Sequence, residues 1–193
     1  MFMLDSFVGG WRGRFGLAML CLACAACTQA DPAGAAAPAV AANRPAEPSA
    51  LLLPVQGIAA RDLRDTFGDG RDGNQRGHEA IDILAPRGTP VLAVADGPIV
   101  KLFLSQPGGI TIYQFDATEQ LAYYYAHLDR YADGLAEGQM VRRGSVMGYV
   151  GSTGNASPDA PHLHFAMFKL GPEKQWWKGE PINPFGYLGG KQP

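Results

Sequence analysis

Cysteine is scarce in this chain and is confined to one end of it. All three cysteines among the 193 residues lie between positions 21 and 27. The chain after position 27 contains none, so that part can form no disulfide and offers no thiolate to a metal ion. Any metal site there has to use histidine or carboxylate ligands.

Strong charge of either sign is also missing. The formal net charge is -2, and neither sign forms a long run. A chain of this kind lacks the basic surface by which proteins attract nucleic acid, so we expect no nucleic-acid partner. The 25 glycines and 15 prolines favour many short elements and turns over long helices.

No apolar run near the N-terminus is long enough to span a bilayer. The run FGLAMLCLACAA (15–26) follows two arginines, and a short apolar core after positive charge is typical of a signal peptide. The residues AAC that end at Cys27 resemble the lipobox of bacterial lipoproteins, in which the cysteine is lipidated and becomes the mature N-terminus. Cys24 stands where that family usually has Leu, and cleavage after ACA (23–25) would instead release a soluble secreted protein.

The chain is therefore expected to have a signal peptide with a lipobox (1–27), lipidation at Cys27 and a membrane anchor through that lipid. The resemblance implies an exported lipoprotein of the cell envelope that faces the periplasm. Thr28 permits sorting to the outer membrane if the cell is Gram-negative. Residues 28–50 are almost wholly Ala, Pro and small polar residues, which predicts a flexible linker.

The folded part is predicted to begin at residue 51. From there, short apolar and β-branched runs alternate with turn residues, at 89–95, 98–104, 109–115, 121–127, 145–151 and 162–168. Strands of this length and spacing favour an all-β fold, mainly an antiparallel β-sandwich or barrel-like core. Only short helical pieces are expected, one of them near 60–65. The oligomeric state stays open.

Two of the four histidines lie two positions apart in an apolar segment, APHLHFAMF (160–168). In a strand, His162 and His164 point to the same face. Imidazoles among apolar side chains each need a polar partner. A metal ion is one such partner, and a hydrogen-bonded pair packed in the core is the alternative.

His78 and Asp82 lie four positions apart in GHEAID (77–82). The spacing invites comparison with the HExxH helix of zinc proteases, but Asp82 replaces the second histidine. Glycines before the segment and Pro86 after it argue against a helix. We therefore expect His78 in a loop, Asp82 on a following strand, and Glu79 facing solvent without a catalytic role.

His127 ends the aromatic run of YYYAHLDRY (123–131). Regular alternation along a strand places Tyr125 on the same face, where it could support the site. The segment GSTG (151–154) lacks the glycine at position 150 that a nucleophile elbow requires, so we interpret it as a turn that shapes the site. Tyr123 to Tyr125 and the pair Trp176 and Trp177 are expected in the core or in a groove wall.

Three nitrogen or oxygen ligands with one open position are what a catalytic zinc needs. The chain offers five candidates, which include all of its histidines, so two would remain as proton carriers or oxyanion stabilisers. The candidates are His78, Asp82, His127, His162 and His164.

The segments HEAID, YAHL and PHLHF, in this order, resemble the signature of the M23 family of zinc metallopeptidases, the LytM- or lysostaphin-type peptidoglycan endopeptidases. The similarity covers roughly residues 51–170, and WWKGEPINPFGYL (176–188) resembles the end of such domains. It implies an M23 domain over 51–188, followed by a C-terminal tail at 189–193. One departure is Ala80, where the family commonly has Gly.

The resemblance implies a role for each candidate. Zn2+ would be bound by three residues, and the other two would flank and activate the water and stabilise the tetrahedral intermediate. The implied metal ligands are His78, Asp82 and His164, and the implied catalytic residues are His127 and His162. The expected activity is zinc-dependent hydrolysis of the peptide cross-links of bacterial peptidoglycan. The alternatives are a latent or non-catalytic LytM-type protein that activates a cell-wall amidase or acts as a scaffold, and a peptidoglycan- or glycan-binding module.

Overall fold

The structure is a computed structural model that describes residues 51–71 and 76–189. The predicted signal peptide, the linker and most of the predicted tail lie outside these residues. All described residues belong to one compact unit of the chain. Among them, no helix is long and apolar enough to cross a membrane.

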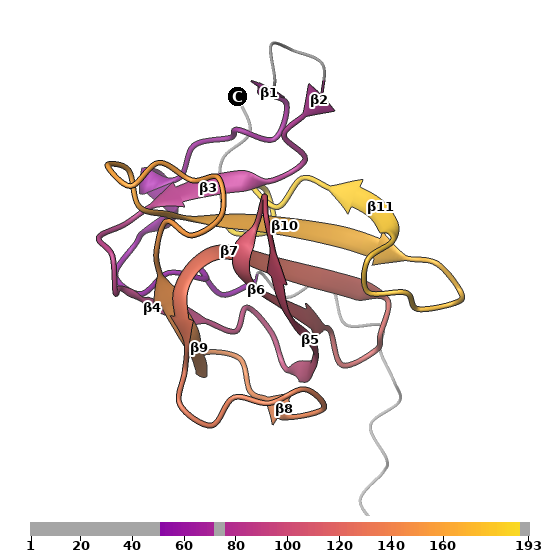
Figure 1. The fold of residues 1–193 in the computed structure, drawn as a ribbon. Helices are drawn as coiled ribbons and strands as arrows, with labels where there is room; N and C mark the ends of the chain where they lie inside the picture. The colour runs from indigo at the N-terminus through magenta and orange to yellow at the C-terminus, as the bar shows by residue number, and fades with distance from the viewer. Residues whose placement is uncertain (1–50, 72–75, 190–193) are drawn as a thin grey trace, which may run out of the picture. The chain divides into compact units, whose positions relative to one another are not determined.

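Nine of the described strands form one antiparallel sheet (Figure 1). Six follow one another in the order β11-β10-β7-β6-β5-β8, while β3 pairs with β10, β9 pairs with β7, and β4 pairs with β9. Their bounds are β3 (Ile81–Leu84), β4 (Pro90–Leu92), β5 (Gly97–Ser105), β6 (Gly109–Phe115), β7 (Leu121–Tyr131), β8 (Met140–Val141), β9 (Val146–Val150), β10 (His162–Leu170) and β11 (Gly179–Ile182).

A two-stranded hairpin, β1 (Gly70–Arg71) and β2 (Arg76–Gly77), precedes the sheet. The only helical element among the described residues is a single 3₁₀ turn, η1 (Ala60–Asp62). The predicted all-β, mainly antiparallel fold with short helical pieces is confirmed.

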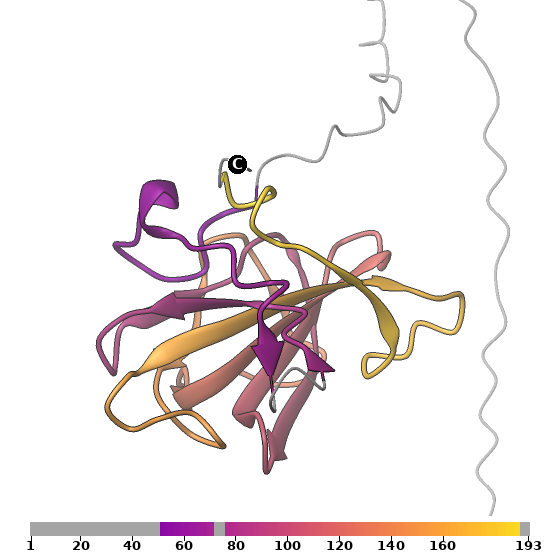
Figure 2. The ribbon, with the colours of Figure 1, turned by 90° about the horizontal axis from the view of Figure 1, so that it is seen from above.

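Strand β10 pairs with other strands along both of its edges, and it carries two of the candidate site residues. One of its edges pairs with β7; along the other edge lie β3 at its start and β11 at its end (Figure 2). Leu163, Phe165 and Met167 are fully buried in the core. Because side chains alternate along a strand, His162 and His164 are directed to the opposite face.

Candidate metal centre

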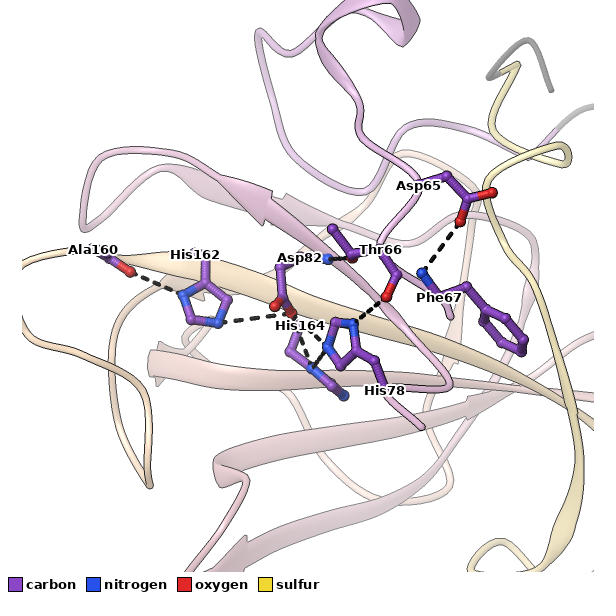
Figure 3. A network of polar contacts seen from close by, with 8 residues as sticks. All are labelled: Asp65, Thr66, Phe67, His78, Asp82, Ala160, His162 and His164. Atoms are coloured by element: carbon purple, nitrogen blue, oxygen red, sulfur yellow. Dashed lines mark hydrogen bonds and ion pairs between the residues drawn. The ribbon is translucent and has the colours of Figure 1, made fainter. Parts of the chain in front are cut away.

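The five candidate residues line one cleft of about 450 Å³. Asp82 comes from β3, His127 from β7, and both His162 and His164 from β10. His78 comes from the loop that joins β2 to β3 (Figure 3). Residues that are up to 86 positions apart in the chain are in contact here.

Strand register brings two of the implied ligands together. His164 is directly opposite Asp82 in the antiparallel pair of β10 and β3. The residue that adopts the left-handed backbone conformation in this segment is Glu79, with φ of 52°, whereas Ala80 is fully buried. The methyl group of Ala80 therefore packs into the core and leaves the ligands in place. Glu79 is exposed, as expected.

Three ligand atoms form a nearly equilateral triangle. The separations of His78 Nε2, His164 Nδ1 and Asp82 Oδ1 are each 3.1 Å. Zinc bonds of about 2.0–2.1 Å in tetrahedral geometry place neighbouring ligand atoms about 3.3 Å apart. The three atoms therefore fit a zinc ion with only a small adjustment.

Hydrogen bonding explains why a cation would fit between these atoms. The backbone carbonyl of Thr66 accepts a hydrogen bond from Nδ1 of His78 at 2.9 Å, so the neutral ring carries a lone pair on Nε2. That lone pair faces Asp82 Oδ1, which is also an acceptor. Two acceptors in contact repel each other unless a proton or a cation lies between them. A divalent cation satisfies all three atoms at once.

The environment keeps two of the candidate ligands in the form that binds metal. In the metal-free protein, burial raises the pKa of Asp82, but the hydrogen bonds and charges that His164 and His78 supply in their protonated forms outweigh burial and hold that pKa well below its usual range. Burial lowers the pKa of His164. A carboxylate and a neutral imidazole are therefore present at neutral pH, as metal binding requires.

His127 and His162 face the cleft beside the triangle, and their ring centroids are 5.0 Å apart. Each donates Nδ1–H to a backbone carbonyl, His127 to Thr153 at 2.8 Å and His162 to Ala160 at 2.9 Å. Each neutral ring thus has Nε2 as its acceptor. Burial lowers the pKa of His127 to about 4, so that ring is neutral at pH 7 and can take up a proton.

A bulge in β7 directs His127 into the cleft. Two residue steps along β6 match three along β7 at this point, and His127 has φ of 61°. The expectation that Tyr125 shares a face with His127 is wrong, because the extra residue interrupts the alternation. Tyr125 is fully buried and donates its hydroxyl hydrogen to Gln114 at 2.8 Å. Tyr124 lines the cleft instead.

The turn at 151–154 holds His127 in position, in agreement with its interpretation as a turn that shapes the site. The Thr153 hydroxyl donates to the carbonyl of Leu128 at 2.7 Å and accepts from the backbone N–H of Ile110 at 3.0 Å. A Cβ atom added at Gly154 would lie 2.4 Å from the backbone nitrogen of Gly109. The turn therefore packs backbone to backbone against the start of β6.

We expect Gly154→Ala to lower turnover about 10- to 100-fold while bound metal stays near the wild-type level. The added methyl group separates the two backbones and displaces the carbonyl that orients His127, and small misplacements of catalytic groups have effects of this size. Gly134→Ala is the matched control, because Gly134 has φ of 76° but no atom within 4 Å of its added Cβ. Equal turnover in both variants would contradict the expectation.

The metal-free protein should lose stability as the pH falls from about 6.5 to about 4. In this range His127 takes up a proton in the unfolded chain, whose pKa is near 6.5, but not in the folded chain, whose pKa is about 4. Below this range stability falls further, because the unfolded chain takes up a proton at Asp82 before the folded chain does: folding lowers the pKa of that carboxyl. Denaturant unfolding with a chelator present measures this, and His127→Asn should reduce the slope. A flat profile would contradict it.

Residues 76–184 match the family model described as "Peptidase family M23". The chain belongs to peptidase family M23. This M23 chain is 37% identical over 119 residues to the L-Ala–D-Glu endopeptidase of Bacillus subtilis (strain 168). The match covers 58% of the chain and 36% of the relative. It is 31% identical over 102 residues to the peptidoglycan DD-endopeptidase ShyC of Vibrio cholerae, covering 53% of the chain and 22% of the relative.

Solved M23 structures share the fold. The catalytic domain of lysostaphin from Staphylococcus simulans is similar with a TM-score of 0.56 and 29% identity, over 66% of this M23 chain and 91% of that domain. The chain thus spans about a fifth to a third of the length of the two curated relatives above, but most of a lysostaphin catalytic domain.

Two supporting residues, Thr66 and Ala160, were not singled out by the sequence patterns, whereas Thr153 lies in the turn that was predicted to shape the site. Thr66, Thr153 and Ala160 act mainly through backbone carbonyls, which every residue type offers. The Thr66 hydroxyl also accepts a hydrogen bond from the backbone N–H of Asp82 at 3.1 Å. Tyr124 was expected, with Tyr123 and Tyr125, in the core or in a groove wall, and it lines the cleft. The assigned roles of ligand and proton carrier stay predictions, and experiments on His164 and His127 test them below.

Proposed function

We propose that this M23 protein is a zinc-dependent endopeptidase that hydrolyses peptide cross-links of bacterial peptidoglycan. One observation carries the proposal: three ligand atoms 3.1 Å apart open onto a cleft that also contains two further imidazoles. His78, Asp82 and His164 would hold the zinc. When bound, zinc supplies a Lewis acid that polarises a substrate carbonyl and lowers the pKa of water toward neutrality.

The chain's own proton carriers complete the chemistry. The Nε2 atom of one imidazole accepts the proton of the attacking water, and later the same proton passes to the amine that leaves when the C–N bond breaks. The other imidazole, in the form that has taken up a proton from solvent at Nε2, donates a hydrogen bond to the oxyanion and returns the proton to solvent afterwards. The carbonyls of Thr153 and Ala160 keep the rings of His127 and His162 turned so that Nε2 faces the cleft.

The names of the relatives support the substrate class. The two curated relatives are named as endopeptidases for bonds that involve D-amino acids, and one name specifies peptidoglycan. Such bonds are characteristic of cell-wall peptides. The lipobox-like segment and the Ala/Pro-rich linker support a protein exported to the cell envelope and anchored there through Cys27.

Digestion of cross-linked peptidoglycan by the purified protein, loaded with one equivalent of zinc, tests the proposal. Mass spectrometry of the products should show dimeric muropeptides replaced by monomers, and the product masses identify the bond. His164→Ala, treated in the same way, is the control for contaminating hydrolases. Intact dimers despite bound zinc would overturn the proposal in favour of the latent or amidase-activating alternative.

We expect Cys27→Ala to release the protein from the membrane. A lipid attached to the thiol of Cys27 would provide the anchor, and the substitution removes that thiol. Fractionation of cells that produce each form should find the wild type in membranes and the variant in the soluble envelope fraction. Cys24→Ala is the matched control and should stay with the membranes. A wild-type protein in the soluble fraction would favour cleavage after residue 25.

A further inference from the structure

Five aromatic side chains form a continuous strip that starts at the metal centre. Tyr124 of β7 lies directly opposite Tyr113 of β6, with ring centroids 4.6 Å apart. Trp176, from the loop between β10 and β11, lies 4.7 Å from Tyr113 and 5.6 Å from Phe103 of β5. Trp177 follows at 5.2 Å from Trp176. We call these five residues the aromatic strip.

The aromatic strip is continuous with the cleft. Tyr124 lines the cleft, and its ring centroid is 6.0 Å from that of His164. A substrate held at the metal centre therefore meets the strip directly. At the other end, Trp177 is 62% exposed and Phe103 is 39% exposed. The strip thus presents apolar surface to solvent along a path that leads away from the reacting bond.

Packing beneath the strip holds it in place. Trp176 packs against a small apolar cluster formed by Phe115, Ala122 and Leu170, which are nearly or fully buried. The hydroxyl group of Tyr124 is hydrogen-bonded to Ser105. A rigid, exposed apolar surface next to a reaction site is a typical binding surface.

The strip itself consists of uncharged rings, although basic residues lie beside it. Lys101, directly opposite Tyr113 on β5, forms an ion pair with Glu137 at 2.9 Å. Lys174, two positions before Trp176, donates to the backbone carbonyl of Glu119. The ion pair offsets the charge of Lys101, whereas a neutral carbonyl leaves Lys174 charged, and Lys178 directly follows Trp177. The exposed ring faces are therefore what indicates the ligand: the apolar C–H face of a sugar ring matches the face of an aromatic ring.

We propose that the aromatic strip binds the glycan chain of peptidoglycan, with sugar rings stacked on Trp177 and Phe103 while the cross-link peptide occupies the cleft. The inference rests on the proposed function. In peptidoglycan the peptide is attached to a sugar, so the glycan lies only a few residues from the bond that is cut. A surface that begins at the cleft is therefore in reach of it.

Titration calorimetry of the purified protein with peptide-free glycan oligosaccharides tests the strip independently of catalysis. The wild type should bind, and Trp177→Ala should weaken binding at least about fivefold. Tyr187→Ala is the matched control, because Tyr187 is a 38% exposed aromatic residue outside the strip. No binding by the wild type, or equal binding by Trp177→Ala, would overturn the inference.

Two substrates with the same cross-linked peptide, one with its disaccharides and one without, separate the inference from the proposed function. The wild type should cleave the sugar-bearing substrate with a kcat/KM about tenfold higher, mainly through KM, and Trp177→Ala and Phe103→Ala should reduce this preference. Cleavage of both substrates at equal rates would overturn the glycan site and leave the endopeptidase proposal standing. Cleavage of neither would overturn the proposed function, and calorimetry would then decide on the strip alone.

Discussion

His164→Ala should lose bound zinc and peptidase activity together. His164 contributes one corner of the triangle, and its removal leaves only His78 and Asp82 to hold the ion. Loss of a residue that merely orients a ligand typically lowers metal affinity 10- to 100-fold, so loss of a ligand should lower it by more than about 100-fold. Zinc content after dialysis, measured together with digestion of cross-linked peptidoglycan, gives both readouts on one sample.

A folding defect has to be separated from the loss of a ligand. His164 lies in the middle of the β3–β10–β7 pairing, so a cavity there could also weaken the sheet. His164→Gln keeps most of the volume and serves as the second variant. Both variants should unfold near the wild-type temperature when all proteins are metal-free, because the stabilisation that bound zinc adds to the folded wild type is then absent. Full zinc occupancy or full activity in either variant would contradict the assigned role.

His127→Asn should keep its zinc but lose turnover by about 10²- to 10⁴-fold, the usual range for a positioned acid or base. The Nε2 atom that accepts the proton is lost, whereas the three ligand atoms are untouched. Asn is chosen because it tolerates the left-handed conformation, and His127 has φ of 61°. Single-turnover rates with zinc-loaded protein measure the effect.

The comparison with His127→Ala separates chemistry from backbone strain. Alanine is less tolerant of this conformation, so it should destabilise the bulge more than Asn does, with a similar loss of turnover. Wild-type turnover in His127→Asn would show that His127 is not the proton carrier. Zinc loss in that variant would indicate that His127 is itself a metal ligand. It would contradict the assignment of His78, Asp82 and His164 as the three ligands.

Sequence pattern alone was sufficient where periodicity and residue chemistry decide the outcome. The strand predicted at 109–115 coincides with β6, because a β-branched run between turn residues has few alternatives. The period of two in β10 correctly placed His162 and His164 on one face, since the intervening Leu163 is fully buried. The chain has only four histidines and no cysteine after position 27, which also limited the possible metal ligands to a short set.

Tertiary structure alone decided where those residues meet and which of their atoms face the cleft. The contact between the candidate ligands Asp82 and His164 depends on a register between strands that lie far apart in the chain, and no local pattern records that register. The bulge at His127 depends on how β7 pairs with β6, so regular alternation misplaced Tyr125. The carbonyls of Thr66, Thr153 and Ala160 select the tautomers, and a carbonyl leaves no signature in sequence because every residue has one.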